Sequence, residues 1–102
     1  MNTIEAQFKV VAVSSNTNSF GLTGIVAVSK SGEAFQFGYN NSLNPVKRDE
    51  MVTLSFPVKT DSVGVAVVEA DMPLLMNGNI IEIPEVLPAP PDDVLKELFP
   101  EL

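Results

Sequence analysis

The sequence predicts an all-β fold: a small five- or six-stranded antiparallel barrel, OB-like or SH3-like, followed by a short C-terminal helix. Three observations support this prediction. Apolar residues recur at every second position through much of residues 1–83, turn-forming residues separate the resulting short runs, and helical spacing of apolar residues occurs only near the C-terminus. The chain has 102 residues, of which 45% are hydrophobic, so one compact core is expected.

The first predicted strand begins at the N-terminus. Alternate positions on one face of this strand are apolar, namely Ile4, Ala6, Phe8, Val10 and Ala12. Val11 and Val13 then make both faces apolar, which is typical of a strand that enters the middle of a barrel. Residues 14–19 are all Ser, Asn or Thr, and this composition predicts a polar loop.

Two strand-like runs follow, at 22–29 and 33–39. They are joined by Lys30-Ser31-Gly32, a short connection with the glycine that hairpin turns favour. Residues 40–48 interrupt the alternation with amide side chains, a proline and two basic residues, which predicts a long connection after the third strand.

The second half of the predicted barrel is built from three runs. Residues 51–58 alternate again, and Pro57 indicates a strand end or an edge position. Residues 63–69 are almost wholly small and apolar, as in a central strand buried on both faces. Asn77-Gly78 predicts a tight turn into a short last strand at 79–83.

The composition changes after Ile83, so we expect a barrel domain at 1–83 and a tail at 84–102. The tail holds five of the eight prolines and five of the thirteen acidic residues, against the single base Lys96. Eight acidic and five basic residues precede the tail, giving the body a net charge of −3 and the tail −4 of the total −7. The tail is therefore a proline-stiffened acidic segment.

The tail contains one short predicted helix, with Asp92 as its N-cap and Pro100 ending it. Its apolar residues are predicted to bind a partner, and these are Val94, Leu95, Leu98 and Phe99. A helix of about seven residues is unstable alone in water, so it must dock. Three destinations are open: the chain's own barrel, a second copy of the chain, or a separate protein with an apolar groove.

A nucleic-acid site is the main alternative use of the barrel. Phe35, Phe37 and Tyr39 share one strand face and could stack bases, with Lys47 and Arg48 near the phosphates. The same alternation also suits a barrel core, in which case Tyr39 is expected to be the ring closest to solvent. The acidic net charge argues against nucleic acid as a partner, because that affinity rests largely on basic residues.

Catalysis, metal binding and membrane insertion find no support in the sequence. The chain lacks cysteine and histidine, so the commonest general base and the thiol and imidazole metal ligands are absent. No motif for a cofactor is present, and we expect no enzyme activity, no cofactor and no metal. The N-terminus lacks a signal-peptide pattern, no apolar stretch is long enough to span a bilayer, and a cytoplasmic location is expected.

These observations favour a non-enzymatic binding or assembly module, with the barrel and the tail used for self-association or for binding another protein. A homo-oligomer is expected. Two alternatives remain open: a barrel that binds single-stranded nucleic acid, and an acidic inhibitor that mimics nucleic acid, as in some mobile-element products.

Overall fold

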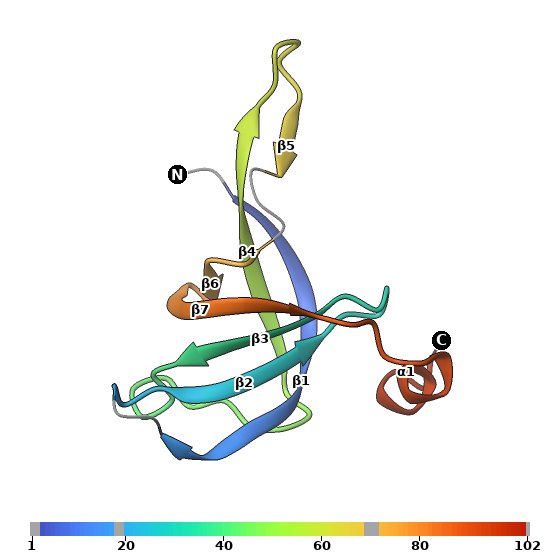
Figure 1. Cartoon of the computed structure of the whole chain (residues 1–102). Helices are drawn as coiled ribbons and strands as arrows, with labels where there is room; N and C mark the ends of the chain where they lie inside the picture. The colour runs from blue at the N-terminus through green and yellow to red at the C-terminus, as the bar shows by residue number, and fades with distance from the viewer. Residues whose placement is uncertain (1–2, 18–19, 69–71, 102) are drawn as a thin grey trace.

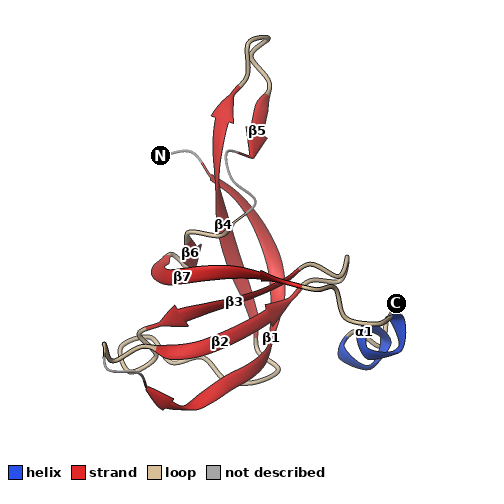
Figure 2. Cartoon of the chain, viewed as in Figure 1, coloured by secondary structure: helices blue, strands red, loops and turns tan. Residues whose placement is uncertain are grey.

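The computed structural model describes residues 3–17, 20–68 and 72–101, with the backbone alone described at 15–17 and 66–68. Strands make up the body and one helix lies near the C-terminus (Figure 2). In chain order the elements are β1 Thr3–Thr17, β2 Thr23–Val28, β3 Ala34–Tyr39, β4 Met51–Thr60, β5 Ala66–Val68, β6 Leu75–Met76, β7 Asn79–Leu87 and α1 Asp92–Leu98.

Within the described part of the chain, six strands close an antiparallel barrel. Their order is β1-β2-β3-β7-β6-β4, and β1 closes the ring by pairing with β4 as well as with β2 (Figure 1). β5 extends the sheet beyond β4 and lies outside the ring. The predicted small antiparallel barrel with a short C-terminal helix is thus confirmed.

β1 serves two neighbours because it is long and irregular. Its first half, up to Lys9, pairs with β4, and its second half, from Lys9 onward, pairs with β2. A register shift between Val10 and Ala12 leaves Val11 outside the main core. The predicted loop at 14–19 is wrong in part, because the strand continues to Thr17; residues 18–19 lie outside the described residues.

Both predicted hairpin turns are present. Gly32, in the β2–β3 turn, has φ of 91°, a conformation that costs a glycine nothing. Asn77 and Gly78, between β6 and β7, have φ of 52° and 82°. Positive φ at both central residues is what a type I′ turn needs, which explains the Asn-Gly pair.

The last strand is longer than the sequence indicated. β7 continues past Ile83, and Glu85, Val86 and Leu87 pair with β3. A register shift interrupts the ladder near Ile83, whose φ of 50° is unusual for a β-branched residue. The predicted boundary after residue 83 therefore falls inside a barrel strand, and residues 84–87 belong structurally to the barrel.

The prediction of a central strand at 63–69 is wrong. Within that run, residues 66–68 form the short β5, which pairs with the outer end of β4, beyond the barrel. Together with the turn at 61–65, these strand ends form a hairpin that projects from the barrel (Figure 1), called here the arm. Pro57 lies inside β4 and not at its end; among the described strands it pairs with β1 alone, at the point where β4 leaves β1 for β5.

Aromatic rings fill the centre of the barrel. The ring centroids of Phe8, Phe35 and Phe56 lie 5.6 to 6.1 Å apart in tilted pairs. Phe37 and Tyr39 complete the same buried cluster. Tyr39 is only 1% exposed, so the expectation that it lies closest to solvent is wrong. Its buried hydroxyl is satisfied, since Asn79 Nδ2 donates a hydrogen bond to it over 3.3 Å.

Candidate functional site

The C-terminal helix packs against its own barrel. α1 follows Pro91, whose carbonyl accepts a hydrogen bond from the Leu95 amide. Pro91, not Asp92, occupies the N-cap position, and no side chain caps the helix, so the predicted Asp92 cap is wrong. Asp92 instead lies in the first turn, where a negative charge favours the helix dipole.

Three of the four tail residues predicted to bind a partner are used in this contact. Phe99 is 2% exposed, and Leu95 and Leu98 pack around it. On the barrel side, the contact is made by Val11, Val28, Ala34 and Leu87. Val94 is 37% exposed and does not belong to this cluster. Of the destinations left open by the sequence, this structure therefore shows the chain's own barrel.

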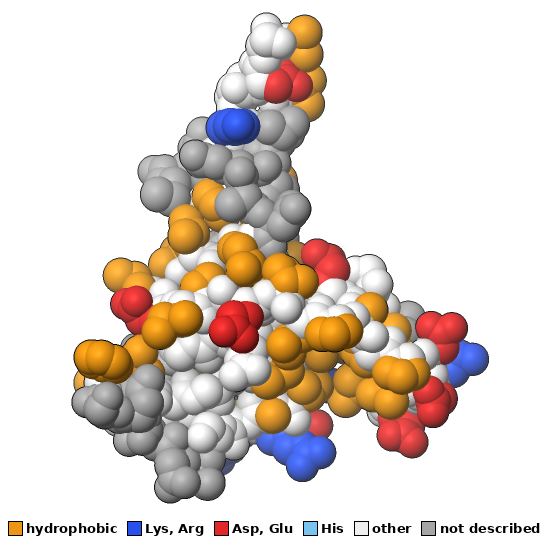
Figure 3. Space-filling view, viewed as in Figure 1, with side chains coloured by type: hydrophobic (Ala, Val, Ile, Leu, Met, Phe, Trp, Pro, Cys, Tyr) orange, Lys and Arg blue, Asp and Glu red, His pale blue; other side chains and the backbone are white. Residues whose placement is uncertain are grey.

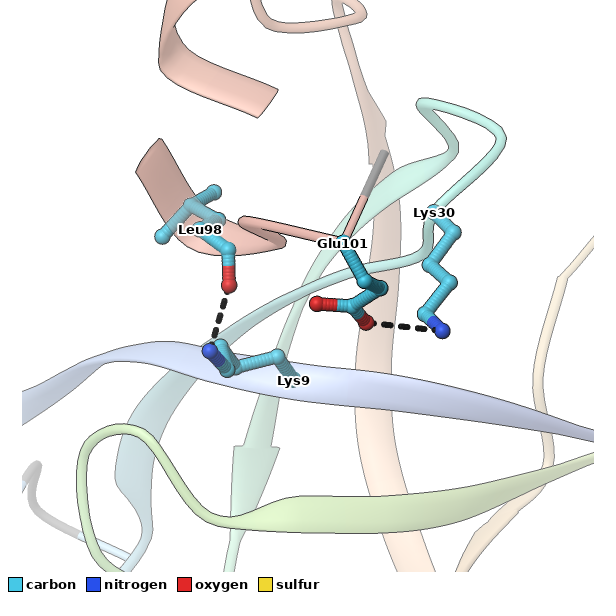
Figure 4. Close-up of polar contacts among 4 residues, drawn as sticks. All are labelled: Lys9, Lys30, Leu98 and Glu101. Carbon is cyan, nitrogen blue, oxygen red and sulfur yellow. Dashed lines mark hydrogen bonds and ion pairs between the residues drawn. The ribbon is translucent and has the colours of Figure 1, made fainter. Parts of the chain in front are cut away.

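Two lysines secure the end of the tail (Figure 4). Lys9 donates a hydrogen bond to the Leu98 carbonyl, and Lys30 Nζ lies 2.7 Å from Glu101 Oε1. The hydrogen bond from Lys30 lowers the pKa of Glu101 below its usual value. Lys30 and Glu101 are more than half exposed, so water screens this ion pair and apolar packing supplies most of the docking energy.

Beside the docked tail, the barrel wall opens into an apolar pocket of about 480 Å³. This pocket, called here the slot, is lined by the first half of β1, by the adjoining ends of β3 and β7, and by the chain leading to α1. Its lining residues are Ile4, Ala6, Gly32, Glu33, Ala34, Phe35, Phe56, Val86, Leu87 and Ala89. Phe35 and Phe56 line the slot and also belong to the core. A volume of this size is typical of ligand sites.

Two strand edges border the slot without a partner strand. β2 pairs with β1 only from Lys9 onward, so residues 3–8 have no strand on the side opposite β4, among the described residues. Likewise, where the structure is described, β7 has no strand beyond Ile81 on the side opposite β3. Unpaired edges present backbone N–H and C=O groups that can extend a sheet. The slot therefore combines apolar walls with backbone hydrogen-bonding capacity.

Exposed apolar side chains continue along β7. Ile80, Ile83 and Val86 are 71%, 68% and 60% exposed. Figure 3 shows hydrophobic side chains gathered over β7 and continuing toward α1. Val86 belongs both to this row and to the slot. Val86 lies in the segment that the sequence assigns to the tail, so it was not predicted as a site residue. The sequence signal that could have identified it is the pair of adjacent apolar residues Val86 and Leu87, which is compatible with a continuing strand.

The arm presents a second exposed apolar surface. Val63 and Val65, at its tip, are 79% and 55% exposed. The turn between them and β4 is ordered by Asp61, whose Oδ1 accepts hydrogen bonds from the Val63 and Val65 amides over 3.0 and 2.9 Å. The sequence marked the run at 63–69 as buried, whereas its described side chains at Val63 and Val65 are exposed.

The structure does not assemble the predicted nucleic-acid site. Phe35, Phe37 and Tyr39 point into the core and are at most 4% exposed, so their faces are closed to bases. Lys47 and Arg48 are exposed in the loop after β3, beside Asp49 and Glu50. The residues of this alternative therefore do not share a surface.

Among the described residues, no group of three or more acidic side chains gathers closely enough to hold a metal ion. No helix in the described ranges has the length and apolar character needed to cross a bilayer. Comparison with family models, with curated proteins and with solved structures finds no match to this chain.

Proposed function

We propose that this protein is a non-enzymatic binding or assembly module, and that its slot docks a segment of a polypeptide, from another copy or from another protein. The observation that carries the proposal is the pairing of apolar walls with unpaired strand edges. The slot is lined by Phe35 and Phe56, among others, and bordered by residues 3–8 of β1 and 82–87 of β7.

The chemistry of the slot suits an extended peptide better than a small polar ligand. An added strand gains backbone hydrogen bonds from a free edge, and alternate side chains enter apolar pockets. Glu33 contributes the slot's charged group. With so few polar groups in the lining, orientation of a small molecule would be poorly defined, whereas a peptide is oriented by its own backbone.

The docked tail supports the slot. Ala34 and Leu87 contact the α1 cluster and also line the slot, and Ala89 of the connection to α1 forms part of its wall. Leu95 Cδ1 lies 3.6 Å from the position a side chain would take at Gly32. The tail thus shapes the slot from behind. Leu95, Leu98 and Phe99 of the tail then stabilise the binding surface without lining it, whereas its earlier apolar residues form part of the slot.

Crosslinking from the slot tests this proposal. A photoreactive amino acid replaces Val86, and the same substitution at Arg48, exposed on the loop after β3, serves as the matched control. Both proteins are irradiated in the expressing cells and after purification at several concentrations. We expect covalent adducts to a polypeptide from position 86 and far fewer from position 48.

The crosslinked products are identified by peptide mass spectrometry. Adducts from position 86 to a defined peptide segment support the proposal. Absence of polypeptide adducts under all conditions, or equal labelling from both positions, contradicts it.

A further inference from the structure

We propose that the slot of one copy of this chain takes the arm of a second copy, so that the protein assembles head to tail. This inference rests on the proposed function and names the occupant of the slot. The main support is the arm, which is apolar at its tip and whose described tip side chains are not buried by the rest of the chain.

The arm has the apolar composition of a buried strand, but its described tip side chains are exposed. Residues 63–68 read Val-Gly-Val-Ala-Val-Val, and the described side chains of Val63 and Val65 are largely exposed. The arm points away from the barrel in Figure 1, so it does not fold back over its own slot. An isolated two-stranded hairpin is marginally stable in water. Burial of the tip in an apolar pocket of a neighbour would remove this exposed surface.

The tip of the arm is held in one shape before binding. The Asp61 amide donates to the Val65 carbonyl over 2.9 Å, and the Gly64 amide donates to the Asp61 carbonyl over 3.1 Å. Gly64 has φ of 86°, which suits the tight turn. A preformed tip loses less conformational entropy on docking than a flexible peptide does. The outer edge of β5 is also free for pairing, since β5 pairs with β4 alone among the described strands.

Charge favours the same pairing. Lys59 is exposed on β4 near the base of the arm tip, opposite Val67 in the ladder. Glu33 is exposed at the slot, where Ser31 Oγ donates to its carboxylate over 3.2 Å. Neither side chain takes part in an ion pair within the described residues. The opposite charges of Lys59 and Glu33 attract the arm of one copy toward the slot of another, and entry of the tip into the slot brings Lys59 toward Glu33.

The arm and the slot are different surfaces, so the contact is heterologous. Each copy offers one arm and one slot, and assembly closes into a ring or continues as a filament. A contact of this kind has a signature that a symmetric dimer lacks. A copy with a damaged arm and a copy with a damaged slot should fail alone and still associate with each other.

The experiment uses two variants of the full chain. The arm variant carries Val63→Asp and Val65→Asp, and the slot variant carries Val86→Asp; all three side chains are exposed, so the fold should survive, as circular dichroism verifies. Light scattering is recorded over a range of concentrations for wild type, for each variant and for their equal mixture. Ile80→Asp, at an exposed position of the same strand that does not line the slot, is the matched control.

We expect the wild type and the Ile80→Asp control to reach at least twice the monomer mass. Each aspartate variant should remain a monomer, and their mixture should give a species of twice the monomer mass and no larger one. A monomeric wild type, self-association of either aspartate variant, or a mixture that stays monomeric overturns the inference. If position 86 crosslinks to another protein while the mixture stays monomeric, only this inference fails; absence of any polypeptide adduct removes the proposed function as well.

A charge exchange adds an independent test. Lys59→Glu should weaken association at least severalfold at low salt, and combining it with Glu33→Lys in the same chain should restore association. Equal association of all these forms overturns the assigned orientation of the arm in the slot.

Discussion

The ammonium group of Lys9 lies 5.3 Å from the centre of the Phe99 ring. This contact connects β1 to the residue that follows α1. The same ammonium group donates to the Leu98 carbonyl, one of the last carbonyls of α1. A cation at a helix C-terminus favours the helix dipole, and a cation over an aromatic face gains further attraction. This contact fixes a helix that would be unstable alone.

Replacement of Phe99 by alanine should release the tail. Truncation of a buried phenylalanine commonly costs about 3 to 5 kcal/mol, and α1 has too few residues to persist undocked. We expect the free energy of unfolding in urea to fall by about 2 to 4 kcal/mol, limited by the docking energy that the tail can lose. Circular dichroism should show the loss of the short helix.

Val94→Ala is the matched control in the same helix. Val94 is exposed and lies outside the docking cluster, so this change should alter the free energy of unfolding by less than about 0.5 kcal/mol. Equal effects of the two substitutions would show that Phe99 does not anchor the tail.

The ion pair at the end of the tail should make docking sensitive to acid. Lys30 lowers the pKa of Glu101 below the ordinary 4.5, so the detached tail takes up a proton more readily than the docked tail. The stabilisation is therefore present above pH 4.5 and is lost as the pH falls through the lower pKa of the docked state. Well above pH 4.5, wild type should unfold at higher urea than Glu101→Gln, and this difference should shrink as the pH falls below 4.5 through the lower pKa of the docked state.

An unchanged difference between wild type and Glu101→Gln across that range would contradict the assigned ion pair. Comparison with the Gln variant is necessary because other carboxylates titrate over the same range.

Tyr39 should ionise at an alkaline pH above its ordinary value. Burial raises its pKa above 10.0, against the smaller opposing effect of the hydrogen bond from Asn79. Because the unfolded chain ionises first, this contribution to stability is present below pH 10 and is lost as the pH rises through the higher pKa of the folded state.

The chain contains one tyrosine and no tryptophan, so phenolate absorbance in the ultraviolet reports Tyr39 alone. The native titration should lie at a higher pH than the titration in concentrated urea. Coincidence of the two curves, in protein shown by circular dichroism to remain folded, would contradict the burial of this ring.

Ile83→Asn should not destabilise the barrel. Ile83 has φ of 50°, a left-handed conformation that costs a β-branched residue about 1 to 2 kcal/mol and that asparagine tolerates better. Its side chain is mostly exposed, so little burial is lost. We expect the free energy of unfolding to rise by about 1 kcal/mol.

Ile80→Asn provides the matched control, since Ile80 is similarly exposed on the same strand and is not among the described residues with positive φ. This change should lower the free energy of unfolding slightly, because asparagine fits strands poorly. Equal changes at the two positions would show that Ile83 carries no backbone strain.

Local patterns predicted much of the fold. Alternation gave the strands at 51–58 and 33–39, the Asn77-Gly78 pair gave its hairpin turn, and helical spacing between Asp92 and Pro100 gave α1. These features depend on residues that are close together in the sequence, so local patterns are enough to predict them.

The errors arose where tertiary context decides. Residues 63–69 have the composition of a buried strand, but composition does not say which surface covers them, and one copy of the chain leaves the described part of this run projecting. Residues 14–17 favour turns, yet pairing with β2 extends the strand to Thr17. Tyr39 is followed by an amide-rich loop, and the ring nevertheless points inward.

The slot was not predictable because it belongs to no single segment. It brings together residues near position 4, near 33, at 56 and near 86, and its opening depends on where β2 ends beside β1. The first three of these stretches have the pattern of ordinary barrel strands, and the fourth lies in the segment whose composition indicates the tail. The missing neighbour along two strand edges becomes visible only when the pairing of all strands is known.

The most direct test of the slot as a docking site is amide hydrogen exchange of residues 82–87 in dilute and in concentrated protein. We predict that exchange in this segment slows as the concentration rises, because an arriving strand covers the free edge of β7, while exchange in the loop at 40–48 is unchanged. Equal exchange of residues 82–87 at every concentration, in samples that light scattering shows to be associated, would contradict docking at the slot.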